Sequence, residues 1–212
     1  MVFRNRTEAG LLLAKKLMAY AHRSDVLVLA LPRGGVAVAF EVARELDVSL
    51  DVFVVRKLGV PGHEELAMGA IAMGGVRVLH KDIIEQLHIS DQIINQVAAR
   101  EEKELKRRES VYRGKRPLPK IAGCVVVLID DGIATGSTMR AAVAALRQQK
   151  PARMIVAVPT VAPSTYNEFK VEVDEMIALI TPEPFYGVGE WYEDFSQMKD
   201  KDVCRLLAEA RV

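Results

Sequence analysis

The sequence predicts an α/β fold, a parallel β-sheet flanked by helices, and three observations indicate it. Strand-like and helix-like stretches alternate along the 212 residues. The apolar run at residues 125–129 is rich in β-branched side chains and too short for a membrane span, as is typical of a strand buried on both faces of a parallel sheet. Half of the residues are hydrophobic, which is enough for a substantial core. We therefore expect a single domain over residues 1–212.

The predicted elements follow one another in a regular order. Apolar residues recur at helical spacing over residues 7–21, and Thr7 with Glu8 favours a helix start there. Further helices are expected at residues 35–46 and 139–149. The expected strands lie at residues 25–31, 51–55, 125–129, 153–159 and 175–180, with a hairpin or strand pair at 68–73 and 76–80. Since ligands of such sheets bind at the carboxyl ends of strands, the loops there are the candidate site.

One helical region interrupts the alternation. Residues 83–112 have a helical pattern throughout, with a restart expected at Ser90, and the insert as a whole is placed at about 83–116. Glutamates precede basic side chains by four positions, as Glu102 precedes Lys106, which supports an exposed helix. The interleaved glutamates favour a solvated face or a dimer contact over a nucleic-acid-binding arm.

Charge and cysteine content exclude some classes of protein. The formal net charge of +1 gives no electrostatic reason to expect nucleic acid or an anionic membrane as a partner. Cys124 and Cys204 lie in apolar settings, which is typical of buried thiols in a cytosolic protein. The first residues lack an apolar signal region, and no stretch reaches the length of a membrane helix. We expect a soluble, cytoplasmic protein.

The residues after the 125–129 run carry the strongest functional signal. Asp130 and Asp131 come first, and their carboxylates can accept hydrogen bonds from sugar hydroxyls. A turn and a helix start follow, with small or hydroxyl side chains at Gly132, Ala134, Thr135, Gly136, Ser137 and Thr138. Small residues let a ligand approach the backbone, and unpaired N–H groups at a helix start bind phosphate. The loop thus offers a phosphate cradle and a diol clamp, spaced like the two ends of a ribose 5-phosphate.

Other interpretations of this loop are weaker. The two acids could simply cap the helix. A Walker-type nucleotide loop needs a lysine, and none lies in this turn. A dinucleotide fingerprint needs its glycines before the helix and an acid about twenty residues later, and that pattern does not fit either.

Residues 126–138 resemble the 5-phosphoribosyl-1-pyrophosphate (PRPP) signature of type I phosphoribosyltransferases, a hydrophobic strand, two acids and Thr-Gly-Xaa-Thr. The resemblance implies that family's fold, with a small C-terminal hood at about residues 160–195, and homodimerisation, which is common in the family. It also implies transfer of the phosphoribosyl group of PRPP to a nitrogenous base, a purine being favoured, with release of pyrophosphate and formation of a nucleoside 5'-monophosphate. Mg²⁺ is expected as cofactor, bound by Asp130 directly or through water. Asp130 and Asp131 would bind the ribose hydroxyls, and residues 134–138 would bind the 5'-phosphate.

A second loop, Arg33-Gly34-Gly35, lies between an expected strand and an expected helix. Its N–H groups can converge on an anion and Arg33 adds a charged fork, although an ordinary turn is the alternative. The loop resembles the short pyrophosphate loop of the same family, which often holds a strained peptide bond. Arg56 and Lys57, at the end of the next strand, are further candidates for binding pyrophosphate.

Within residues 55–70, Arg56 and Lys57 are expected to end a strand, and Gly59, Pro61 and Gly62 mark a loop that need not be rigid. In the family this place holds the flap that closes over pyrophosphate and excludes water. The segment is similar to the flap of adenine phosphoribosyltransferases, but their flap glutamate has Ala67 in its place. The candidates for catalytic acid–base work are then His63, Glu64 and Glu65, each of which is equally consistent with a solvated loop.

Aromatic residues gather in residues 182–195, a segment rich in proline and glycine that suits stacking on a planar base. The segment resembles the hood of 6-oxopurine phosphoribosyltransferases, in which a phenylalanine at the position of Phe185 stacks on the purine. Those enzymes use an aspartate where this chain has Ala134. For Trp191, Tyr192 and Phe195 the alternative is packing on the core.

Two other functional classes stay open from the sequence. The chain could be a PRPP-binding regulatory protein that has lost catalysis, although such relatives usually carry a DNA-binding domain and no helix-turn-helix candidate is evident. It could also be a hydrolase or phosphorylase of ribose phosphates. The acceptor base is not identified by the sequence.

Overall fold

The computed structural model describes residues 1–210, apart from the side chain of Glu65. The chain separates into two compact units. The first comprises residues 1–52, 119–136 and 150–210, and the second comprises Phe53–Leu118 and Ser137–Gln149. The single-domain organisation expected from the sequence stays a prediction.

The first unit is built on a five-stranded parallel sheet, which confirms the predicted fold class. Its strand order is β2-β1-β6-β7-β8. The strands are β1 (Val26–Ala30), β2 (Ser49–Val52), β6 (Val125–Ile129), β7 (Arg153–Thr160) and β8 (Glu175–Ile180). Every residue of β1 and β6 is buried, as the unbroken apolar run of β6 predicts for a strand covered on both faces.

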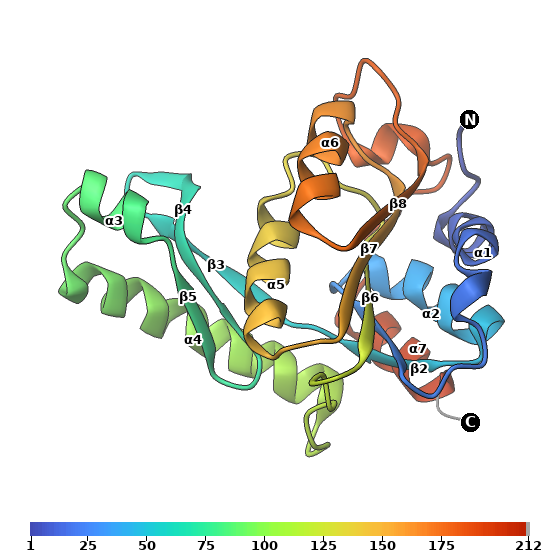
Figure 1. The fold of residues 1–212 in the computed structure, drawn as a ribbon, viewed down its shortest axis with the longest axis horizontal. Coiled ribbons are helices and arrows are strands. Elements are labelled where there is room, and N and C mark those ends of the chain that lie inside the picture. Colours follow the sequence, from blue (N-terminus) through green and yellow to red (C-terminus); the bar gives the residue numbers. More distant parts are fainter. Residues whose placement is uncertain (211–212) are drawn as a thin grey trace. The chain divides into compact units, whose positions relative to one another are not determined.

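Helices flank this sheet. They are α1 (Arg6–Lys16), α2 (Gly35–Leu46), α6 (Pro163–Glu172) and α7 (Asp200–Glu209), with short 3₁₀ turns η1 (Met18–Tyr20) and η2 (Val188–Trp191). Figure 1 shows α6 on one side of β7 and β8, and α1 with α2 on the other. A Cβ on Gly10 would lie 2.7 Å from the carbonyl oxygen of Val38, so this glycine permits the close packing of α1 on α2. The helix predicted over residues 7–21 ends earlier, at Lys16, and η1 follows it.

The second unit holds a three-stranded antiparallel sheet in the order β3-β4-β5. Its elements are β3 (Val55–Val60), β4 (His63–Ala72), β5 (Val76–Leu79), α3 (Lys81–Gln86), α4 (Asp91–Arg113) and α5 (Ser137–Gln148). The predicted strand pair and the helix restart are confirmed. The restart has a clear local cause, because the Ser90 hydroxyl accepts a hydrogen bond from the N–H of Ile93 and caps α4.

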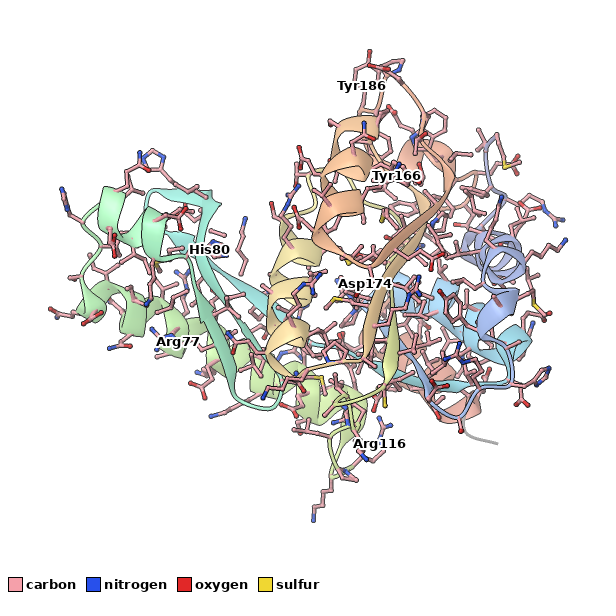
Figure 2. The ribbon with its side chains drawn as sticks, viewed as in Figure 1. Arg77, His80, Arg116, Tyr166, Asp174 and Tyr186 are labelled. Carbon is pink, nitrogen blue, oxygen red and sulfur yellow. The ribbon has the colours of Figure 1, made fainter. Side chains whose placement is uncertain are left out.

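The loop expected around Gly59, Pro61 and Gly62 is shorter than predicted, because the strands on either side of it extend to Val60 and from His63 and form the β3–β4 hairpin. Its turn is confined to Pro61 and Gly62, and the pairing shifts register around Gly59. Pairing of β4 with both neighbours satisfies backbone groups that a loop would expose. The Nδ1 of His80, labelled in Figure 2, lies 2.9 Å from the Ala67 carbonyl and adds a further link between β4 and the end of β5.

The sheet register of the first unit brings two predicted loops together. Strands β1 and β6 are parallel neighbours, with Ala30 opposite Ile129, and the N–H of Leu31 donates to the Ile129 carbonyl at 2.9 Å. The loops that follow these two strands therefore leave the same edge of the sheet side by side. No helix within residues 1–210 has the length and apolar character needed to cross a membrane.

Candidate functional site

The loop after β6 is fastened at several points within the first unit. Ile133 forms a bridge to Val161, and its N–H donates to the Thr160 carbonyl at 2.9 Å. The Thr165 hydroxyl donates to the Ala134 carbonyl at 2.7 Å. The Tyr192 hydroxyl donates to the Asp131 carbonyl at 2.6 Å. These bonds hold the backbone from Asp131 to Ala134 in one arrangement.

Asp130 and Asp131 differ in their surroundings. The Asp131 N–H donates to Asp130 Oδ1 at 2.8 Å. Asp131 Oδ2 accepts a hydrogen bond from Arg6 Nε at 2.8 Å, in an ion pair whose side chains are only 11% (Arg6) and 14% (Asp131) exposed. Burial, and then the neighbouring Asp131 carboxylate, raise the pKa of Asp130 well above its ordinary value. Burial and the neighbouring carboxylate thus oppose the ionisation of Asp130, while Arg6 pairs with Asp131.

The loop after β1 lies directly against these acids. A Cβ on Gly34 would overlap Asp131 Oδ2 and lie 2.6 Å from Asp131 Cγ, and one on Gly35 would lie 2.8 Å from Asp130 Cα. Gly34 has ordinary right-handed helical dihedrals, so proximity rather than backbone conformation is what requires glycine there. The structure therefore brings the predicted pyrophosphate loop and the two acids together.

Arg33, the charged residue of that loop, is about one-third exposed, and its Nη1 lies 3.7 Å from Asp200 Oδ1 at the start of α7. The Pro32–Arg33 peptide bond is cis. An exposed ion pair of this length contributes little to stability, so the guanidinium can exchange its partner for a bound anion at small cost.

The predicted phosphate cradle begins in the first unit and continues into α5. Ala134 and Thr135 are exposed, whereas Gly136 is buried and has a φ of +77°, a backbone conformation that favours glycine. Ser137 is half-buried and Thr138 exposed in the first turn of α5. The division between the two units falls between Gly136 and Ser137.

The aromatic residues of the hood divide into two groups. The rings of Phe185 and Trp191 stack with centroids 6.4 Å apart and planes at 27°, and Phe185 is half-buried. Neighbouring Tyr186 is 81% exposed. Figure 2 shows it at the tip of the loop after β8. Tyr192 is buried against Phe3, with ring centroids 5.4 Å apart. Of the two alternatives from the sequence, packing on the core therefore holds for Tyr192. Phe185 is half-buried in the exposed loop.

The second unit holds the other predicted site residues. Arg56 is engaged by the nearly buried Glu101 of α4, with Nη2 2.7 Å and Nε 2.9 Å from Glu101 Oε2. Lys57 is half-buried in β3. The pyrophosphate-binding roles of these two residues stay predictions.

The candidate acid–base residues lie at the β3–β4 turn, where His63 and Glu64 are exposed. Glu64 Oε1 accepts a hydrogen bond from the Gly62 N–H at 3.3 Å. Hydrogen bonds from its own N–H and from that of Gly62 lower the pKa of Glu64, which makes it a weaker proton acceptor. The side chain of Glu65 lies outside the described part of the structure.

A family model described as the phosphoribosyl transferase domain matches residues 6–188. The chain belongs to the phosphoribosyltransferase family. The match includes both loops at the carboxyl edge of the parallel sheet and the β3–β4 hairpin, and it ends at residue 188, within the aromatic segment 182–195.

Similar proteins agree with this assignment. Two Mycobacterium tuberculosis proteins, each named "Putative phosphoribosyl transferase", are 41% identical over 209 residues, or 99% of this chain. The chain spans about half (47%) of the length of these curated relatives. The crystal structure of TT1426 from Thermus thermophilus matches with a TM-score of 0.89 and 43% identity, covering 99% of each chain. A hypoxanthine-guanine phosphoribosyltransferase from Bacillus anthracis matches with a TM-score of 0.53 and 14% identity, covering 92% of each chain, which shows the fold alone.

Carboxylate oxygen is a protein ligand that Mg²⁺ prefers, and Asp130 is the residue predicted to supply it. Among residues 1–210, apart from the Glu65 side chain, no three His, Cys, Asp or Glu side chains gather into a metal-binding group. One carboxylate suits a Mg²⁺ ion that keeps its water or substrate ligands, and it does not suit a cage of protein ligands.

Sequence reasoning missed Arg6. This residue donates to Asp131 across 125 positions of the chain, and its guanidinium lies 4.0 Å from the centroid of the Phe195 ring. No local motif announces such a pair, because the contact exists only once α1 has packed beside the sheet. A basic residue at the first position of a helix was the one available signal, since cations are unfavourable there.

Proposed function

We propose that this protein transfers the 5-phosphoribosyl group of PRPP to a nitrogenous base, a purine being favoured. The products are pyrophosphate and a nucleoside 5'-monophosphate. One observation carries the proposal, the packing of the Gly34–Gly35 loop against Asp130 and Asp131. Because an anion-binding loop and a diol-binding pair of acids adjoin, a single PRPP molecule can engage both through its pyrophosphate and its ribose.

Asp130 and Asp131 hold the ribose through its 2' and 3' hydroxyls. Cleavage of the bond between C1' and the pyrophosphate oxygen develops positive charge on the sugar ring. The negative charge that the two acids share lies beside the same ring, so it stabilises the transition state as well as the bound substrate. The fastening of this loop by Tyr192 and Thr165 supports such a role, because the acids need no reorganisation when charge develops.

Phosphate groups are held by backbone N–H groups and basic side chains. The exposed backbone of Ala134 and Thr135, continued by Gly136, Ser137 and Thr138 in the chain, binds the 5'-phosphate. Arg33 with the N–H groups of Gly34 and Gly35 binds pyrophosphate. Arg56 and Lys57 are proposed to assist in binding pyrophosphate, and His63, Glu64 and Glu65 to take part in acid–base catalysis.

Mg²⁺ dependence is part of the proposal, and Asp130 would hold the ion directly or through water. When bound, the ion would neutralise part of the charge on the leaving pyrophosphate. The chain's own contribution is to orient the ribose against Asp131 and to keep a carboxylate oxygen of Asp130 available.

Base recognition is assigned to the hood. Phe185 is half-buried and stacks on Trp191, so one ring face is supported while the loop around it stays exposed. Such a supported ring suits stacking on a planar purine. Cytoplasmic location and a homodimer stay predictions.

The test is a pyrophosphate-release assay with PRPP, Mg²⁺ and a panel of purine and pyrimidine bases. We expect release with one or a few bases and a fall of more than about 10²-fold in turnover for Asp131→Asn, the scale of losing one preorganised stabilising group. Release without any base would instead indicate a ribose-phosphate hydrolase. Tight PRPP binding without release would indicate a regulatory protein, and near-full activity of Asp131→Asn would refute the role of that acid.

A further inference from the structure

Arg6 occupies a position that helix stability does not explain. It is the first residue of α1, where the helix dipole disfavours a cation by about 0.3–1 kcal/mol. The N-terminus of the helix is already capped, since the Asn5 side chain accepts a hydrogen bond from the N–H of Glu8. The Arg6 side chain is only 11% exposed, and a charge this buried requires compensating partners.

Those partners come from two distant segments of the first unit. Arg6 Nε donates to Asp131 Oδ2 at 2.8 Å, and Arg6 Nη1 donates to the Ser196 carbonyl at 2.9 Å. The guanidinium also lies over the Phe195 ring, 4.0 Å from its centroid. A planar fork with two directed donors and a stacked face has one orientation, and a lysine ammonium cannot reproduce it.

This fixed guanidinium restrains the Asp131 carboxylate. Asp131 Oδ2 is held by Arg6, the backbone of Gly34 closes over the same oxygen, and the Asp131 carbonyl is held by the Tyr192 hydroxyl. The carboxylate is therefore restrained both at Oδ2 and through its own backbone. An unrestrained aspartate would sample several rotamers, most of which aim neither oxygen at the ribose.

We propose that Arg6 is a positioning residue that acts through Asp131, with Phe195 and the Ser196 carbonyl holding Arg6 in place. This inference rests on the proposed function, because it takes Asp131 as the group that binds the ribose. It adds the N-terminal helix and residues 195–196 to the part of the chain that orients PRPP.

The test is a double-mutant cycle on kcat/KM with Arg6→Met, Asp131→Asn and the combined variant, in the full chain with PRPP, Mg²⁺ and the best base. We expect Arg6→Met alone to lower kcat/KM by about 10²-fold, the cost of misplacing a reacting group by about 1 Å. In the Asp131→Asn background the same change should alter kcat/KM less than about twofold, since the residue it acts through is already disabled. A purely structural role would lower activity equally in both backgrounds.

Arg4→Met is the matched control, because Arg4 is 73% exposed and its ion pair with Glu8 stays within α1 and the residues before it. It should keep wild-type kcat/KM. Arg6→Lys should recover less than half of the loss, since it retains charge without the fork; if Arg6→Met does not fold, Arg6→Lys takes its place in the cycle. Equal effects of the Arg6 change in both backgrounds, or none in either, would overturn the role of Arg6 alone. Calorimetry that detects no PRPP binding by the wild-type protein would overturn the proposed function, and the role of Arg6 with it.

Discussion

Gly34→Ala tests the close packing of the two loops. The new methyl group would overlap Asp131 Oδ2 and lie 2.6 Å from Asp131 Cγ and 3.2 Å from Arg6 Nε. The backbone of Gly34 is in the right-handed helical region, where alanine is at least as comfortable as glycine. Any effect therefore comes from the lost space and not from a forbidden conformation.

The magnitude follows from that overlap. Ordinary van der Waals contact begins at 3.4 Å, so Asp131 Cγ must retreat by at least about 0.8 Å from its 2.6 Å position, and the overlapping Oδ2 must move further, or the loop must move instead. A displacement of about 1 Å of a reacting group costs about 10²-fold in rate. The crowding also destabilises the fold by about 1–3 kcal/mol, the usual range for an overpacked site.

The assay compares Gly34→Ala with Gly187→Ala for PRPP affinity, pyrophosphate release and melting temperature. A Cβ on Gly187 meets no atom within 4 Å, and its φ of 179° is extended backbone that any residue adopts. Gly187→Ala should behave as wild type. We expect Gly34→Ala to lose about 10²-fold in kcat/KM and several degrees of melting temperature. Wild-type kcat/KM in Gly34→Ala would refute the reasoning, because the acids would then tolerate displacement.

Three further predictions follow from other parts of the structure. Burial raises the pKa of Glu41, so the ionisation of this carboxyl opposes folding. This loss of folding free energy is absent below the ordinary pKa of the carboxyl and grows as the pH rises through the raised pKa. Glu41→Gln should therefore raise the melting temperature at neutral pH and leave it unchanged below about pH 4, and a gain that is equal at both would contradict this. Phe185→Leu should weaken base binding by about 1–3 kcal/mol, measured as a rise in the steady-state KM for the base, without changing PRPP affinity. Tyr186→Leu should weaken base binding less, and equal effects of the two changes would contradict base stacking by Phe185. Leu128→Ala, at a fully buried position of β6, should lower the free energy of unfolding in urea by about 2–5 kcal/mol, and a loss below about 1 kcal/mol would contradict the two-faced burial of this strand.

Much of the fold was accessible from sequence because local signals agreed with the tertiary structure. The β6 run is apolar at every position and is buried at every position. The helix predicted at residues 35–46 is α2, and the hydroxyl of Ser90 explains the predicted restart. The adjacency of the two glycine-containing loops also followed from general topology, since both leave the carboxyl ends of parallel strands.

The failures share a physical cause, which is dependence on distant partners. Turn formers at Gly59, Pro61 and Gly62 indicated a loop, but strand pairing on both edges of β4 made the segment a hairpin. The sequence also did not indicate the ion pair of Arg56 with Glu101, 45 positions away, while the pyrophosphate-binding role of Arg56 stays a prediction. Residue types alone do not say which partner a long basic side chain will meet.

Calorimetric titration of PRPP with Mg²⁺ into the wild-type protein and into Asp131→Asn tests the central claim most directly. The paired acids at the end of β6 should give the wild-type protein saturable binding, and loss of one charged acceptor should weaken it by at least about tenfold. Equal binding by the two proteins, or no binding heat from the wild type, would contradict the assignment of this strand end as the ribose site.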